Sequence, residues 1–286
     1  MNVAKALALP TIFVLATASA LAVTAAPADC DRTLSVGNSP SVSVGTGAGY
    51  IHVRSGSNSQ VHIICHVHSS ESGSDVDSRI RQIVANPPIV QSSNEITIGR
   101  HDGNDDLYRN IVIDYDITLP ATSVITAATG SGDVDIQNAG SKLSAHSGSG
   151  SVHAHGIPGP ANLQTGSGSI ELDQTASGEV RAQTGSGTIR INGATSALTA
   201  RTGSGSIEVT GKPAPNWQLN TGSGSIRLTV GNVPFTVEAN TGSGGIHIQQ
   251  PVSMQNSMNR HHLTATVNGG GPAINLSTGS GDIQIQ

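Results

Sequence analysis

Large side chains are scarce in this sequence. Among 286 residues there are only two Phe, three Tyr and one Trp, and charged residues make up 12%. A globular core built around aromatic side chains is therefore not expected, and the formal net charge of −5 does not suit a partner such as nucleic acid or anionic lipid. Apolar residues still reach 36% and glycines number 35. These proportions predict a β-rich chain with a thin aliphatic core rather than a disordered one.

Long apolar runs are missing except at the N-terminus. Lys5 provides a positive charge, residues 7–23 are mostly apolar, and residues 26–28 (APA) resemble an A-x-A cleavage site. This pattern predicts a secretory signal peptide over residues 1–28. A retained membrane anchor is the alternative, but Pro10 and the many alanines make a weak span, and no other run approaches the roughly 20 residues of a membrane helix.

Removal of that segment leaves an exported protein located in the periplasm, at the outer surface or outside the cell. Loss of Lys5 changes the formal charge to 13 − 19 = −6. No membrane span is expected after signal removal. Cysteine is also rare, with only Cys30 and Cys65 present, and an oxidising compartment predicts a disulfide between them. A lipid-modified Cys30 is the alternative, but residues 27–29 (PAD) do not match a lipobox.

What the sequence has in abundance is Gly-Ser-Gly. The first Gly of this motif falls at positions 130, 148, 166, 185, 203, 222, 242 and 279, giving steps of 18, 18, 19, 18, 19, 20 and 37. We interpret the last step as two periods with one degenerate member between them. A repeat of this length predicts a solenoid in which each coil buries its apolar face against its neighbours.

Strict alternation around each motif excludes a flexible Gly/Ser linker. Before the turn, alternate positions are small or apolar and end in a hydroxyl, as in Val180, Ala182 and Thr184. After it, two apolar residues such as Ile189 and Ile191 flank an outward one. This predicts two half-buried strands per coil, with glycines at a corner that has no room for a Cβ.

A stack of antiparallel hairpins would also alternate. The same residue types recur once per period, however, which favours parallel coils, and we expect these to be right-handed. The predicted fold is therefore an all-β, right-handed parallel β-helix or β-solenoid with coils of 18–20 residues and an N-terminal β-rich cap containing one short helix.

Outward residues of stacked coils should lie about 4.8 Å apart and form ladders. The first predicted ladder contains Asp135, His153, Glu171, Arg190, Glu208, Arg227 and His247, with Gln284 beyond the degenerate coil. Charge alternates from Glu171 to Arg227, which indicates a structural role worth about 0.2–1 kcal/mol per pair. A second ladder is rich in amides and contains Gln164, Gln183, Arg201, Asn220 and Asn240.

Residues 29–120 are less regular, and we expect them to cap the repeat solenoid of residues 121–286 as a continuous part of it. Predicted strands lie at 42–44, 50–54, 61–68, 95–98 and 111–119. Apolar spacing predicts a helix over 74–84, with Ser74 and Asp77 resembling a capping box. No cap follows the last repeat strand, so we expect its open edge to self-associate with another chain or to be covered by the insertion at 251–271.

The order of these motifs resembles a known family. YDITLP at 115–120, GSGDV at 130–134 and the repeated TGSGSI units, together with the upstream strands at 42–44 and 49–53, are similar to the bacterial β-strand-repeat family of unknown function labelled putative adhesin. The resemblance covers nearly all of the chain after residue 28, except that the insertion at 251–271 departs from it. It implies an exported, envelope-associated β-solenoid and supplies no catalytic residues.

An enzyme is the main alternative, because parallel β-helices include polysaccharide lyases and hydrolases. The candidate acids are Asp114, Asp116, Asp133 and Asp135, in two pairs that each share a strand face. These acids are few, neighbouring coils offer no basic cluster, and no nucleophile elbow or zinc-protease motif occurs. We therefore predict that the protein is not catalytic.

Histidine pairs raise the question of a metal site. Two imidazoles share a strand face at each of two positions, and a third pair lies in the insertion: His66 and His68, His153 and His155, and His261 and His262. No third ligand is evident for any pair, and the Asp required by calcium-binding nonapeptide repeats is absent from most coils. We expect no metal and no cofactor.

The predicted function is therefore that of a non-catalytic, exported structural or adhesin-like interaction surface at the cell envelope. Trp217, the only Trp, points inward by its parity in the strand, so a glycan would have to be recognised by the amide and hydroxyl ladders. The expected partners are an envelope glycan or a protein ligand, and not nucleic acid. A polysaccharide-active β-helix enzyme remains the second hypothesis.

Overall fold

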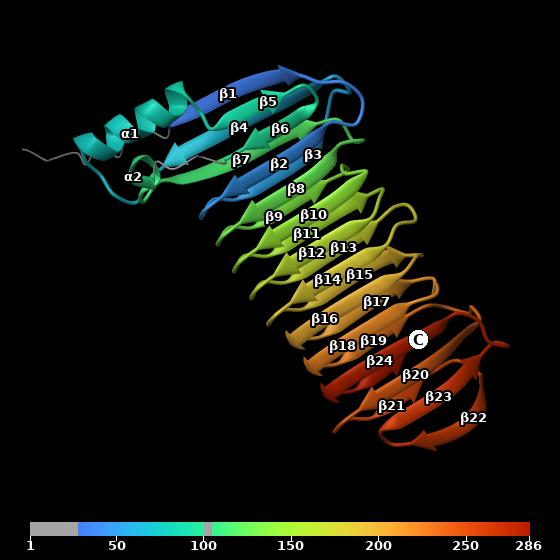
Figure 1. Cartoon of the computed structure of the whole chain (residues 1–286). Helices are drawn as coiled ribbons and strands as arrows, with labels where there is room; N and C mark the ends of the chain where they lie inside the picture. Colours follow the sequence, from blue (N-terminus) through green and yellow to red (C-terminus); the bar gives the residue numbers. More distant parts are fainter. Residues whose placement is uncertain (1–27, 100–104) are drawn as a thin grey trace, which may run out of the picture.

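The chain forms one elongated stack of β-coils with a cap at its N-terminal end (Figure 1). The structure is a computed structural model that describes residues 28–99 and 105–286, without the side chains of 253–258. Two sheets run along the stack. Sheet A has the strand order β1-β4-β7-β3-β9-β11-β13-β15-β17-β19-β25-β21, and sheet B has the order β22-β23-β20-β24-β18-β16-β14-β12-β10-β8-β2-β6-β5.

Each regular coil contributes one strand to sheet B and, after the Gly-Ser-Gly corner, one strand to sheet A. The pairs are β8 (Val124–Thr129) with β9 (Val134–Gln137), β10 (Lys142–Ser147) with β11 (Val152–Ile157), β12 (Ala161–Thr165) with β13 (Ile170–Gln174), β14 (Val180–Thr184) with β15 (Ile189–Ala194), β16 (Leu198–Ser204) with β17 (Ile207–Gly211), and β18 (Trp217–Ser223) with β19 (Ile226–Thr229). Neighbouring strands of these coils are parallel in both sheets. The predicted β-solenoid is therefore confirmed, and the alternative of stacked hairpins is excluded for these coils.

Both glycines of the corner are required by the closeness of the coil beneath. A Cβ on Gly168 would lie 2.1 Å from the carbonyl oxygen of Gly150, and one on Gly166 would lie 2.3 Å from that of Gly148. Neither glycine has a φ in the left-handed region. Steric exclusion by the neighbouring backbone, rather than conformational freedom, thus explains the motif.

The buried hydroxyl that precedes each corner donates to a backbone carbonyl of the neighbouring coil's corner. Thr184 Oγ1 donates to the Gly168 carbonyl at 2.8 Å, and Thr202 Oγ1 donates to the Gly187 carbonyl at 3.0 Å. Equivalent bonds are made by Thr129, Ser147, Thr165, Thr221, Thr241 and Thr278. Because buried carbonyls need partners, this explains why a hydroxyl ends every inward series.

The last coils are not stacked in chain order. After β19 the chain forms β20 (Phe235–Thr241) and β21 (Ile246–Ile248), then the antiparallel pair β22 (Val252–Asn259) and β23 (His262–Val267), and finally β24 (Ala273–Ser280) and β25 (Ile283–Ile285). β24 lies between β18 and β20, and β25 lies between β19 and β21. The prediction of a degenerate coil between Gly242 and Gly279 is therefore wrong. The insertion forms an antiparallel hairpin instead, and the chain after it goes back to lie between the β18–β19 coil and the β20–β21 coil.

The C-terminus consequently lies on an inner coil, before the tip of the stack (Figure 1). β23 pairs antiparallel with β20, so the β22–β23 hairpin covers the end of sheet B. The C-terminal strands β24 and β25 are therefore not edge strands. Of the two expected outcomes, coverage by the insertion is confirmed for sheet B, and self-association with another chain stays a prediction. The corresponding edge of sheet A belongs to β21, which has three residues, and short edge strands limit unwanted pairing.

The N-terminal part continues the stack and then closes it. β2 (Ser41–Thr46) and β3 (Ile51–Ser55) form a coil against β8 and β9, and β6 (Glu95–Ile98) and β7 (Val112–Leu119) form the next one. β1 (Ala28–Ser35), β4 (Gln60–His68) and β5 (Ile89–Ser92) then add antiparallel strands. The five predicted strands of this part are present, whereas β1 and β5 were not predicted.

Two helices flank the cap. α1 (Ser74–Ala85) buries Val76, Ile80 and Ile83 and packs beside β1 and β4, as its apolar spacing predicts. The predicted capping box is wrong, because the N-cap is Gly73, which has no side chain to cap with, and the Asp77 amide donates to the Gly73 carbonyl. α2 (Asp105–Tyr108) was not predicted. The predicted signal peptide lies outside the described residues except for Ala28, and within the described part no helix is long and apolar enough to cross a membrane.

Candidate interaction faces

The outer face of sheet A carries a continuous row of mostly charged side chains, which we call the charge ladder. From the cap toward the tip it runs through Asp116, His52, Asp135, His153, Glu171, Arg190, Glu208, Arg227, Gln284 and His247. Acid and base alternate at every step from the first member to Arg227. Opposite charges directly across neighbouring strands stabilise that register.

The central members of the charge ladder, from Asp135 to Arg227, lie in the predicted order, whereas its two ends differ from the prediction. Gln284 lies between Arg227 and His247, so the predicted order at the tip is wrong because the last coil is inserted out of chain order. His52 and Asp116 were missed for the same reason at the cap. The signal for His52 was present, since G-Y-I-H-V at 49–53 has the same frame as G-D-V-D-I at 132–136.

In the C-terminal half of the charge ladder the bases are arginines. Arg190 Nε lies 3.1 Å from Glu208 Oε2, and Arg227 Nη1 lies 3.8 Å from Glu208 Oε1. These side chains are between 33% and 53% exposed. Exposed pairs contribute only about 0.2–1 kcal/mol each, so this half of the face supports strand register and leaves no arginine without a carboxylate.

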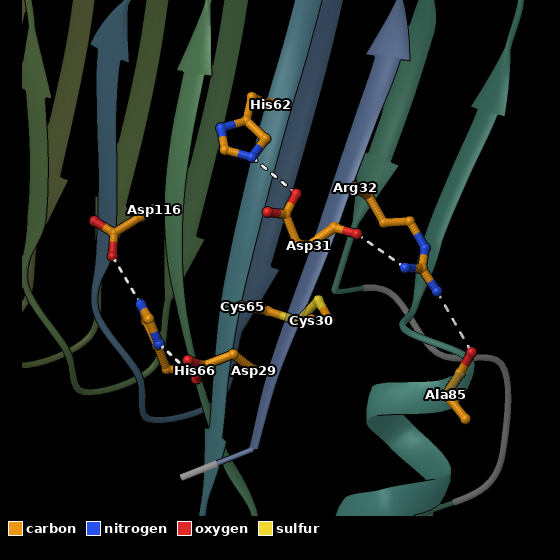
Figure 2. The surroundings of a disulfide bond; sticks show 9 residues. All are labelled: Asp29, Cys30, Asp31, Arg32, His62, Cys65, His66, Ala85 and Asp116. Atoms are coloured by element: carbon orange, nitrogen blue, oxygen red, sulfur yellow. Dashed lines mark hydrogen bonds and ion pairs between the residues drawn. A yellow bond between two sulfur atoms is a disulfide. The ribbon is translucent and has the colours of Figure 1, made fainter.

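In the N-terminal half the bases are histidines. Each of several imidazoles meets one or two aspartates on the next strand: His52 with Asp116, His62 with Asp31, His66 with Asp29 and Asp116, His68 with Asp114, and His155 with Asp173. The bonds of His62 and His66 appear beside the disulfide in Figure 2. The acid-base alternation therefore extends across β1 and β4, with histidine in place of arginine as the base.

His66 is held between two carboxylates. Its Nδ1 lies 2.8 Å from Asp29 Oδ1 and its Nε2 lies 3.1 Å from Asp116 Oδ2. A neutral imidazole can donate only one of these bonds, whereas the imidazolium donates both. The hydrogen bond to Asp29, supported by that to Asp116, accordingly raises the pKa of His66 against the opposing effect of partial burial.

Asp173 shows the complementary effect on the acid side. Asn192 Nδ2 donates to its Oδ1 at 2.7 Å, and His155 Nδ1 lies 2.6 Å from its Oδ2. Both partners favour the carboxylate form. They lower the pKa of Asp173, with the bond from Asn192 as the larger cause.

The two cysteines are joined. Cys30 on β1 and Cys65 on β4 lie directly across the antiparallel pair, with their Cα atoms 5.1 Å apart, and form a disulfide (Figure 2). Both residues are buried, with 2% of Cys30 and 0% of Cys65 exposed. The bond fixes the edge strand of sheet A, and in this structure the Cys30 thiol is not free for a lipid.

The four candidate acids of an enzyme are used within the fold. Asp114 Oδ1 accepts from the Tyr50 amide at 2.9 Å, and Asp133 Oδ1 accepts from the Ser151 amide at 2.7 Å. Asp116 and Asp135 line a hollow of about 120 Å³ on either side of His52. His52 therefore stands between these two carboxylates and meets Asp116 directly.

The histidine pairs do not converge with third ligands. The rings of His153 and His155 are stacked with centroids 6.5 Å apart, and His262 Nδ1 lies 2.6 Å from Asn240 Oδ1. Among residues 28–99 and 105–286 no group of three His, Cys, Asp or Glu is arranged to hold a metal ion.

The outer face of sheet B is different in chemistry. Its first row contains Thr126, Ser144, Asn162, Arg181, Thr199, Gln218, Asn275 and Glu238, and its second row contains His146, Gln164, Gln183, Arg201, Asn220, Ser277 and Asn240. The predicted amide ladder is thus the second row, with Ser277 placed between Asn220 and Asn240. Arg181, in the first row, was not singled out from the sequence.

A depression of about 220 Å³ lies on this face, and we call it the sheet B hollow. It is lined by Asn162, Gln164, Arg181, Ala182, Gln183, Thr199 and Arg201. No carboxylate is among these lining residues. The hollow therefore presents two guanidinium groups among neutral hydrogen-bonding side chains.

Comparison with known proteins identifies the architecture. The family model described as Toastrack DUF4097 matches residues 51–286, which is more than half of the chain. Two solved structures are similar over 90% of this chain: a putative cell adhesion protein from Clostridium sporogenes (11% identity, 98% of that chain, TM-score 0.27) and a putative adhesin from Bacteroides fragilis (13% identity, 97% of that chain, TM-score 0.42). No curated protein matches.

Proposed function

The chain belongs to the Toastrack DUF4097 family, and from this premise we propose that it is a non-catalytic, exported β-solenoid that serves as an adhesin-like interaction surface at the cell envelope. The observation that carries the proposal is the pair of long polar faces that the two sheets present. Each face repeats its side chains once per coil, which gives an extended surface for a partner that is itself long or repetitive.

The state of the acids supports binding over catalysis. General acid-base chemistry needs carboxyl groups that are available to a substrate proton. Asp114 and Asp133 instead accept backbone hydrogen bonds, and Asp116 is engaged by His52 and His66. These roles are structural, so an interaction surface accounts for them more simply than an active site does.

Export is supported by two features. Residues 1–28 have the composition of a signal peptide, and the Cys30–Cys65 disulfide is of the kind that persists in oxidising compartments.

A sedimentation assay tests the proposal. Purified protein of residues 29–286 is mixed with insoluble bacterial envelope fractions, and both the protein retained in the pellet and the reducing ends released into solution are measured. We expect retention without product. Absence of retention would contradict an interaction surface, and product release that disappears in Asp116→Asn or Asp135→Asn would replace it with the polysaccharide-active enzyme.

A further inference from the structure

We propose that the sheet B hollow binds carboxylate groups of an acidic polysaccharide, with Arg201 as the main anchor and Arg181 as the second. This inference rests on the proposed function and names the ligand class for one of the two faces. A polymer that carries one uronate after another matches a surface whose polar side chains recur about every 4.8 Å.

Arg201 is the first observation. The structure gives its guanidinium one hydrogen bond, from Nη2 to Gln218 Oε1 at 3.4 Å. On the opposite face Arg190 and Arg227 both meet Glu208. A guanidinium has five donors arranged to hold a carboxylate in two parallel bonds. Arg201, unlike Arg190 and Arg227, has no carboxylate within ion-pair distance among the described residues, so its charge is available to a ligand.

Arg181 lies diagonally across from Arg201 on the neighbouring strand. Thr199 stands directly across from Arg181 in the pairing of β14 with β16, and Gln183 stands across from Arg201. Diagonal neighbours of this kind are about 7–8 Å apart, within the joint reach of two long side chains. Glu179 Oε1 engages Nη2 of Arg181 at 2.6 Å from outside the hollow, which leaves further donors of that guanidinium for a ligand.

The amides around the arginines suit the rest of a sugar. Asn162, Gln164 and Gln183 each present a donor and an acceptor, the combination that ring hydroxyls require. The one hydrogen bond between these lining amides, from Gln164 Nε2 to Asn162 Oδ1, is long at 3.5 Å. They are therefore little committed to the fold, and binding can engage them without breaking strong internal bonds.

The charge distribution directs an anionic chain to this face. Across β9, β11, β13, β15 and β17 the outer face of sheet A carries four carboxylates: Asp135, Glu171, Asp173 and Glu208. Stacked sheets lie about 10 Å apart, beyond the Debye length of about 8 Å at 0.15 M salt. Salt therefore weakens the repulsion between these acids and an anion on sheet B, whereas an anion on sheet A would meet them directly.

The test compares polygalacturonate with its fully methyl-esterified form and with dextran, using residues 29–286 and isothermal titration calorimetry. We expect polygalacturonate to bind and both neutral polymers to fail. A charged hydrogen-bonded pair contributes about 1.5–3 kcal/mol, so Arg201→Gln should weaken binding about tenfold or more, Arg181→Gln should weaken it less, and both together should abolish it.

Arg190→Gln and Arg227→Gln are the matched controls, because each removes the same charge from the opposite face. They should leave the affinity for polygalacturonate unchanged, and equal melting temperatures would show that all four variants fold. Equal binding of the esterified polymer, equal losses on both faces, or no binding of polygalacturonate would each overturn the proposal. In the last case retention on envelope fractions would still stand, which separates failure of this inference from failure of the proposed function.

Discussion

The two outer faces of the solenoid differ although the inner faces follow one rule. Inward positions on both sheets are small, aliphatic or hydroxyl side chains, and a Gly-Ser-Gly corner joins the two strands of each regular coil from β8 to β19. Outward, sheet A alternates acid and base from β1 to β19, whereas sheet B repeats amides and hydroxyls. The inward pattern determines the fold, and the outward residues can differ because they contact other outward side chains of the same sheet and not the core.

The two faces also differ in whether their charged side chains are paired with opposite charges. On sheet A each arginine of the ladder shares Glu208, and each histidine near the cap meets an aspartate. On sheet B Arg201 has only an amide partner at 3.4 Å. A face whose charges neutralise one another supports the stack, while a face with an uncompensated cation can recognise a ligand.

Breaking the disulfide should give the largest effect, and it should affect sheet A more than sheet B. Replacing both Cys30 and Cys65 by Ala removes a crosslink between β1 and β4, and loss of a disulfide typically costs about 2–4 kcal/mol. In a solenoid each layer is stabilised mainly by its neighbours, so the loss should stay near the cap. Hydrogen exchange should accelerate in β1 and β4 but not in β5 and β6.

A reductant provides the control for this experiment. It should reproduce the exchange pattern in the natural protein and add nothing in the double variant. Equal acceleration along the whole stack would show that the cap and the coils unfold as one unit.

Gly168→Ala should come next, and it should affect both faces together. The new Cβ would lie 2.1 Å from the Gly150 carbonyl oxygen and 2.7 Å from the Ser151 amide nitrogen, both of them backbone atoms. Overpacking of this kind costs about 1–3 kcal/mol, measured as a fall in the free energy of unfolding in urea. Ser167→Ala, in the exposed middle of the same corner, is the matched control and should be nearly neutral.

The third prediction uses pH to change one face only. The raised pKa of His66 means that its contribution to stability is fully present below the ordinary value of 6.5 and is lost as pH rises through the folded-state value. Hydrogen exchange in β1 should therefore speed up as pH rises above 6.5, beyond the intrinsic increase in exchange rate. His66→Gln should reduce this dependence, whereas His146→Gln on sheet B should not, and equal slopes in both variants would contradict the role of His66.

The repeat unit could be predicted from sequence because its signals are local. Alternation, the hydroxyl before the corner and the pair of glycines all depend on neighbours within one coil or at one fixed spacing. The order of coils could not be predicted in this way. β24 and β25 re-enter the stack beneath β20 and β21, and β6 and β7 lie outside β2 and β3, because antiparallel strands reverse the chain and no local pattern records on which side it returns.

The same limit explains what was found and missed at the two faces. Six consecutive members of the charge ladder could be predicted from their period, while His52 and Asp116 belong to coils stacked out of chain order. On sheet B the amide ladder with Arg201 was visible in the repeat. The sequence alone did not indicate that Arg181 lies diagonally beside Arg201, because that position depends on the register of β14 with β16.

The smallest expected effect distinguishes the two kinds of arginine. A double-mutant cycle with Arg190→Gln and Glu208→Gln should give a coupling energy of about 0.2–1 kcal/mol in urea unfolding, since the pair is 48% and 33% exposed, and salt should weaken it. The cycle of Arg201→Gln with Gln218→Ala, whose hydrogen bond is long, should give a coupling near zero. A coupling for Arg201 as large as that for Arg190 would mean that its guanidinium is committed to the fold, and the contrast between a self-neutralised face and a ligand-binding face would then be lost.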